Sequence, residues 1–176
     1  MDREKIASTK ENAEHTLDQV TSWVNSVDTK ASYALSLTSI LTGFILIQGI
    51  PQAFSAVCVA ESISLSLLVG VVLVLLLYLS SYAAIFLLVY AIVARVSTNN
   101  KNSSHLFFGH ISKRELAEYV QEFTELTEEQ YISELLEQIH TNSKICMKKI
   151  SFYQRGIYAL IIAISLCFLC CLFQLI

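Results

Sequence analysis

Proline and charged residues are both scarce in this chain of 176 residues, which has one proline, Pro51, and is only 15% charged. Because proline interrupts helices more strongly than any other residue, its near absence favours long helices. The 33 residues of the window 62–94 contain no charge and no proline. A helix of about 20 apolar residues crosses a bilayer core, so this window predicts a transmembrane helix.

Two other windows, 31–60 and 156–176, also lack charged residues, and each is long enough for one span. The window 62–94 is too short for two spans and a turn, so we expect three spans in total. The remaining segments are too short to build a large core alone. We therefore expect an all-α membrane protein with three transmembrane helices and cytoplasmic helical extensions. Its expected parts are a cytoplasmic N-terminal helix (1–30), the first two spans with a short outer loop (31–95), a cytoplasmic helical segment (96–152) and the third span (153–176).

Lysine and arginine are missing from the connection between the first two spans, around residues 51–61. All twelve basic residues either precede the first span or lie between the second and third. Basic residues mark cytoplasmic loops, so this asymmetry predicts a multi-pass protein with a cytoplasmic N-terminus. The first apolar run begins only after Lys30, and no cleavable signal peptide is therefore expected.

Motifs for catalysis and metal binding are also missing. The chain has no nucleophile elbow, no glycine-rich phosphate loop and no convincing pair of catalytic carboxylates. His105 and His110 lack further ligands at a recognisable metal-binding spacing. The predicted spans carry none of the ionisable groups that pumps and charge-coupled transporters usually need within the membrane. We expect no enzyme, no cofactor, no metal and no nucleic acid polymer as a partner.

A heptad pattern is present before the first span, where residues 8–30 are predicted to be helical. Ser8 and Glu11 have the spacing of a capping box. Apolar residues recur at heptad-like intervals along a seam of Ile6, Ala13, Leu17, Val20, Val24 and Val27. Such a seam needs a partner helix, either in the chain's own second cytoplasmic segment or in another subunit. No breaker follows, so the helix should continue into the first span.

The first span is polar for a membrane helix, because serine, threonine and glycine recur between positions 32 and 49. Small and hydroxylated residues allow close approach of helices, although they could also line a wet path. The segment 51–61 is expected to be a short outer connection. Its brevity makes the first two spans antiparallel neighbours.

Two further capping boxes are predicted in the segment 96–152. Ser112 and Glu115 would begin a short helix that ends near Thr124, and Thr127 and Gln130 would begin a long one. The long helix runs without a breaker into the third span. Its apolar face is expected to consist of Ile132, Leu135, Leu136, Ile139, Ile145 and Ile150.

Basic residues gather before the third span, where Lys144 and Lys148 are i,i+4 neighbours on one helix face. This face could anchor the chain to anionic lipid headgroups or bind a phosphate group. Asp28 and Lys30 are two residues apart and do not face each other on a helix. Each of them therefore needs another partner.

Three blocks of the sequence carry a resemblance to a known family. The run from Trp23 to Ala31, WVNSVDTKA, resembles the W-x4-D-x-K-A signature of the Pycsar transmembrane effector family. LFFGHI at 106–111 resembles its second block, and Gln138-Ile139 with Ser143-Lys-Ile145 and Lys148 is similar to its third. The three blocks and the spacing of the spans cover most of the chain.

The resemblance implies a bacterial inner-membrane protein of anti-phage defence. Members of the family bind cyclic UMP or cyclic CMP, made by a cyclase that senses infection, and then impair the membrane. By resemblance, the motif positions are Trp23, Asp28, Lys30, Phe108, Gly109 and Lys148, and the basic face adds Lys144 as a candidate ligand contact. We expect a phosphate to contact lysine and a base to contact Trp23 or Phe108.

The expected function is therefore a nucleotide-gated, homo-oligomeric effector whose partners are the cyclic nucleotide and membrane lipid. Two other functions fit the residues alone. One is a ligand-free membrane scaffold that recruits a partner through its cytoplasmic helices, and the other is a small channel without a gate.

Overall fold

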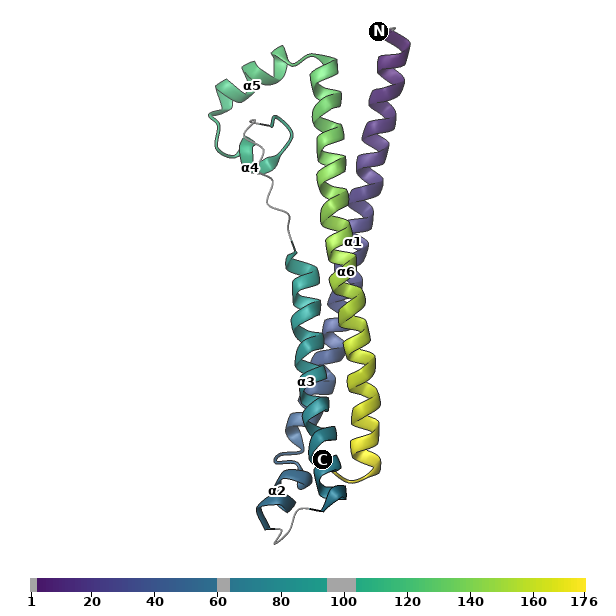
Figure 1. The fold of residues 1–176 in the computed structure, drawn as a ribbon. Coiled ribbons are helices and arrows are strands. Elements are labelled where there is room, and N and C mark those ends of the chain that lie inside the picture. Colours follow the sequence, from purple (N-terminus) through teal and green to yellow (C-terminus); the bar gives the residue numbers. More distant parts are fainter. Residues whose placement is uncertain (1–2, 60–63, 95–103) are drawn as a thin grey trace. The chain divides into compact units, whose positions relative to one another are not determined.

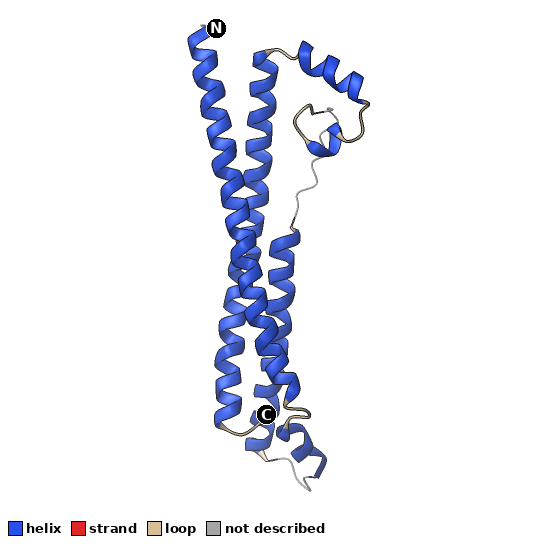
Figure 2. Ribbon diagram, turned by 180° about the vertical axis from the view of Figure 1, so that it is seen from behind, coloured by secondary structure: helices blue, strands red, loops and turns tan. Residues whose placement is uncertain are grey.

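The computed structural model describes residues 3–59, 64–94 and 104–176, except for the side chains of Arg3, Cys58 and Phe108. Within these ranges the regular structure is entirely helical (Figure 2). The helices in chain order are α1 (Arg3–Ile47), α2 (Gln52–Val59), α3 (Leu65–Val93), α4 (Phe108–Ile111), α5 (Leu116–Glu125) and α6 (Glu128–Leu172) (Figure 1).

Three of these helices, α1, α3 and α6, are long and apolar enough to cross a membrane. The prediction of an all-α membrane protein with three spans is therefore confirmed. The first and third spans were predicted to continue without a break from the polar helices that precede them. This is also confirmed, because α1 and α6 each contain 45 residues.

One of the three predicted capping boxes is present. The backbone N–H of Thr127 donates to Gln130 Oε1 at 3.0 Å, and the N–H of Gln130 donates to Thr127 Oγ1 at 3.3 Å. The box at Ser8 was wrong, because the good helix formers before it extend α1 back to Arg3. The box at Ser112 was also wrong, because α5 is capped at Glu115 without a side-chain hydrogen bond.

The connection between the first two spans is more than a loop, because it contains α2. The chain reverses after α6 through Gln174, whose φ is 53°. This turn lets the carbonyl oxygen of Leu175 accept a hydrogen bond from the N–H of Ala53 at 3.3 Å. Figure 1 shows the C-terminus beside α2. The C-terminal residues thus help to hold the connection between the first two spans in place.

The chain forms two compact units. The first unit comprises residues 1–26 and 95–147, and the second comprises residues 27–94 and 148–176. Both α1 and α6 contribute residues to each unit, since each helix runs across a unit boundary.

The second unit is built on one face of α3. The buried residues of α3 follow alternating steps of four and three: Gly70, Val74, Leu77, Ser81, Ala84, Leu88 and Ala91. This is the heptad spacing of helices that pack side by side. Val74 and Leu77 belong to a core cluster with Ile45 of α1 and Cys170 of α6. The three candidate spans therefore share one core.

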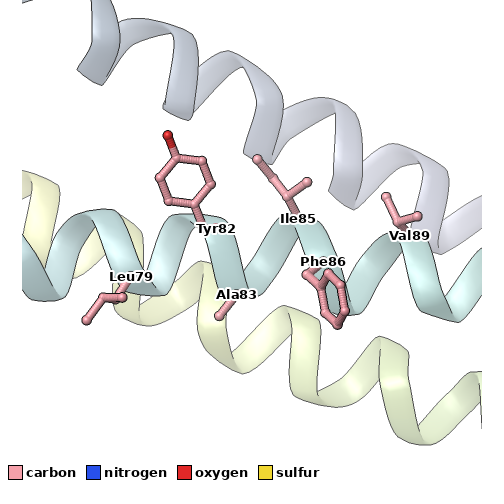
Figure 3. Close-up of a pocket in the computed structure, with 6 residues that line it drawn as sticks. All are labelled: Leu79, Tyr82, Ala83, Ile85, Phe86 and Val89. Atoms are coloured by element: carbon pink, nitrogen blue, oxygen red, sulfur yellow. The ribbon is translucent and has the colours of Figure 1, made fainter.

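The outward surface of α3 carries an open groove in which the side chains are apolar or aromatic (Figure 3). Its lining residues are Leu79, Tyr82, Ala83, Ile85, Phe86 and Val89. No group in this lining carries a charge that could hold a phosphate. The groove suits contact with lipid tails.

In the first unit, the heptad seam of α1 has a partner within the chain. Ala13 and Val20 of the seam are buried, and so are Ile132 and Leu135 of α6. The hydroxyl of Tyr131 donates to Glu14 Oε1 at 3.3 Å across the two helices. This is the first of the two partners that the sequence left open.

The expected apolar face of α6 was partly wrong. Leu136 is 51% exposed rather than packed. Leu136 follows Ile132 by four residues and lies at the edge of the stripe that contains the buried Ile132 and Leu135.

Candidate functional site

One buried lysine connects all three candidate spans. Lys149 of α6 is only 5% exposed. Its ammonium group donates to Asp28 Oδ1 of α1 at 2.5 Å and to the carbonyl oxygen of Ile92 of α3 at 2.6 Å. All three residues belong to the second unit. We name Asp28, Ile92 and Lys149 the lysine junction.

Helix geometry explains why the lysine junction forms at this place. Lys149 lies seven residues before Gly156, on the face of α6 that is buried against the other spans. Ile92 is in the last turn of α3, where carbonyl oxygens have no partner within their own helix. A cation beside these carbonyls also interacts favourably with the helix dipole. Lys149 therefore satisfies the end of α3 while it pairs with Asp28.

The two charged members of the junction differ in their access to water. The side chain of Lys149 is 6% exposed, whereas that of Asp28 is 34% exposed. Removing one partner from a buried ion pair typically costs about 3–5 kcal/mol, because the other charge is left unpaired. The lower part of this range applies here, since water already reaches Asp28. The cost should be greater when Asp28 is lost than when Lys149 is lost.

The junction identifies the partner that the sequence required for Asp28. Lys149 was not among the predicted site residues. The prediction rested on the i,i+4 spacing of Lys144 and Lys148, which does not include Lys149. A usable signal was present in the sequence. Lys149 lies three residues after Cys146 and seven before Gly156, so a lysine interrupts an apolar stripe at helical spacing.

Lys30 and Lys148 lie beside the junction along their own helices. Lys30 follows Asp28 by two residues on α1, and Lys148 directly precedes Lys149 on α6. Because Asp28 and Lys149 are paired, Lys30 and Lys148 lie at a similar height along α1 and α6. Both Lys30 and Lys148 are exposed. Two exposed lysines thus lie close in sequence to the two members of the ion pair.

A second polar cluster lies in the first unit, where Glu134 of α6 holds the chain just before α4. His105 Nδ1 is 2.6 Å from Glu134 Oε1. Glu134 Oε2 accepts from the hydroxyl of Ser104 at 2.9 Å and from the N–H of His105 at 2.8 Å. Burial alone would raise the pKa of Glu134, but the hydrogen bonds from His105 and Ser104 outweigh it and lower that pKa.

Helix α5 contacts the same histidine. Glu122 Oε2 is 3.7 Å from His105 Nε2 and 3.1 Å from Nη1 of Arg114. The hydroxyl of Tyr119 donates to the carbonyl oxygen of His105 at 3.2 Å. His105 therefore contacts both α5 and α6, and it directly precedes residues 106–111, which resemble the second block of the family.

Gly109 is in this block, and its missing side chain has a local reason. A Cβ at position 109 would lie 2.6 Å from Cε1 of Phe107. The ring of Phe107 in turn meets the ring of His110 edge-on, with centroids 5.3 Å apart. Glycine thus gives the Phe107 ring room beside α4. The side chain of Phe108 lies outside the described part of the chain.

The remaining predicted site residues are accessible. Trp23 is 59% exposed, and Lys144 is exposed on α6. Trp23, Gly109 and Lys144 belong to the first unit, whereas Asp28, Lys30 and Lys148 belong to the second. Within the described residues, no group of three or more His, Cys, Asp or Glu side chains is placed to hold a metal ion.

The chain is similar in sequence to proteins of one known family. A family model described as the Pycsar effector protein domain matches residues 12–176. The Pycsar effector protein GmPycTM of Gulbenkiania mobilis is 25% identical over 175 residues, with 86% of this chain and 86% of that protein covered. No solved structure matches the chain.

Proposed function

Because the chain belongs to the Pycsar effector family, whose members act in anti-phage defence, we propose that it is a nucleotide-gated effector of the bacterial inner membrane. In this proposal the chain binds a cyclic pyrimidine mononucleotide, cyclic UMP or cyclic CMP, on its cytoplasmic side. It then impairs the membrane as a homo-oligomer. No enzymatic step is needed, since binding alone can shift the packing of the spans.

The observation that carries the proposal is the pair of exposed lysines beside the lysine junction. Lys30 and Lys148 are exposed residues, and their sequence neighbours Asp28 and Lys149 form the junction that joins α1, α3 and α6. A phosphate monoanion is a suitable partner for such groups, because charge-assisted hydrogen bonds are about twice as strong as neutral ones. A ligand that binds one packing of the helices better than another shifts the population toward that packing.

Further ligand contacts are predicted in the first unit. Trp23 is 59% exposed, and its indole ring is of the type on which a pyrimidine base stacks; Phe108 is the predicted alternative. Lys144 adds another exposed cation. In this proposal Asp28 holds the fold through Lys149 and need not contact the ligand.

Calorimetric titration of the purified full-length protein with cyclic UMP and cyclic CMP tests the proposal. We expect Lys30→Glu and Lys148→Glu each to weaken binding by tenfold or more, since each replaces an attractive charge by a repulsive one. Lys5→Glu is the matched control. It makes the same charge change on α1, but about 35 Å along the helix from Asp28, and it should leave the affinity unchanged.

Two results would contradict the proposal. If neither cyclic nucleotide binds the wild type, the ligand class is wrong. If both charge reversals bind as the wild type does, the lysines are not the phosphate site. Expression in cells also separates the other functions, because an ungated channel harms cells without any nucleotide and a scaffold never does.

A further inference from the structure

We propose that the lysine junction is a latch that holds the effector in its resting state and must open before the membrane is impaired. This inference rests on the proposed function for the identity of the signal. The latch itself is argued from three residues that come from the three candidate spans. It gives Lys149 a positioning role that neither the family signature nor the exposed basic face indicates.

One side chain joins three candidate spans. The ammonium group of Lys149 contacts α1 through Asp28 and α3 through the carbonyl oxygen of Ile92. Movement of either α1 or α3 away from α6 breaks one of these hydrogen bonds. A single buried charge therefore ties the relative positions of three helices together.

The latch lies at the edge of the apolar windows. Asp28 comes just before the charge-free window 31–60, and Lys149 comes seven residues before the window 156–176. Ile92 is one residue from the end of α3. A charge in the middle of the bilayer could not be released into water. At this edge, however, an opened Lys149 can be hydrated, so a second state is accessible.

The two charged side chains of the latch are unequally exposed to solvent. Water reaches Asp28 far more readily than Lys149, with side-chain exposures of 34% and 6%. The closed state thus depends on the negative charge of Asp28, because Lys149 has little solvent to replace it. A phosphate anion that reaches Lys149 can compete with Asp28 for its ammonium group, which is how the ligand would open the latch.

The test uses the full-length protein reconstituted in vesicles that contain a fluorescent dye. Asp28→Asn keeps the shape of the side chain but removes its charge. Loss of a buried counter-charge shifts such an equilibrium by about a hundredfold at the lower end of the usual range. We therefore expect dye release without nucleotide, at a rate roughly tenfold or more above that of the wild type. Asp28→Glu keeps the charge and should stay closed.

Two further variants test the asymmetry and the closed state. Lys149→Met should release dye less than Asp28→Asn does, since the remaining Asp28 can be hydrated. Asp28→Leu combined with Lys149→Met replaces the ion pair by apolar side chains, a change that is often neutral or stabilising in other proteins. This double variant should remain closed even when cyclic nucleotide is added. Release of dye from it as from the wild type would overturn the latch.

Calorimetry on the same variants separates the latch from the proposed function. Asp28→Asn should still bind the nucleotide that the wild type binds. If it neither binds nor leaks, Asp28 is a ligand contact and the latch is refuted. If it binds normally but stays closed without nucleotide, the latch is refuted and the proposed function remains. If the wild type binds no nucleotide, dye release from Asp28→Asn still decides the latch.

Discussion

Gly156 of α6 gives the sharpest prediction about how the spans pack, because it faces Leu88 of α3 at very short range. A Cβ at position 156 would lie 2.8 Å from both Cγ and Cδ2 of Leu88 and 3.4 Å from its backbone nitrogen. Leu88 is fully buried, with 0% exposure. It cannot turn into open space, so Gly156→Ala must move α3 and α6 apart.

Overpacking of this kind typically costs about 1–3 kcal/mol. We expect Gly156→Ala to lower the free energy of unfolding by that amount, as measured by titration with a denaturing detergent in mixed micelles. Gly43→Ala is the matched control. A Cβ at position 43 of α1 would meet nothing within 4 Å, and alanine is the better helix former by up to about 1 kcal/mol. The control should therefore be neutral or slightly stabilising.

A double-mutant cycle assigns the cost to the named contact. Leu88→Ala alone should cost about 2–5 kcal/mol through the cavity that it leaves. In the Leu88→Ala background, Gly156→Ala should cost much less than it does in the wild type, because the clashing atoms are gone. If Gly156→Ala destabilises both backgrounds equally, or destabilises no more than Gly43→Ala, the tight approach of α3 and α6 is not as described.

Three further predictions concern the polar contacts. Glu134→Gln should lower stability by about 1–3 kcal/mol and speed amide exchange at Ser104 and His105, since both donate to this carboxylate. The pKa of Glu134 is lowered in the folded protein, so its ionised side chain stabilises the fold near neutral pH. This stabilisation is lost as the pH falls through that pKa. Glu134→Gln should therefore make the free energy of unfolding less dependent on pH in acid. Thr127→Ala should cost about 0.5–2 kcal/mol and expose the N–H of Gln130 to exchange, because it removes the cap of α6.

The spans and the long helices could be predicted from the sequence because they depend on local properties. A window without charge must avoid water, and a segment without proline has little reason to break. From these rules, a helix was predicted within the window 62–94, where α3 lies. The same rules predicted that α1 and α6 continue from polar segments into spans. Short motifs predicted less well. A capping-box spacing does not predict a helix start when good helix formers lie on both sides of it, as around Ser8.

The lysine junction could be predicted only in part. The sequence showed that Asp28 needed a partner, and an apolar stripe interrupted by a lysine could have identified Lys149. The third member could not be found in this way, because it is the backbone oxygen of Ile92. Any residue type supplies that group, and only the packing of α3 against α6 selects it. The same holds for Gly156 and Leu88, whose contact depends on the relative rotation of two helices.

Dye release from vesicles that contain the wild-type protein tests the central claim most directly. With cyclic UMP, cyclic CMP, linear UMP and linear CMP added in separate runs, we expect release with at least one cyclic nucleotide and none with the linear ones. Release that is the same with and without nucleotide, or a tight complex with a cyclic nucleotide that never releases dye, would contradict a nucleotide-gated membrane effector.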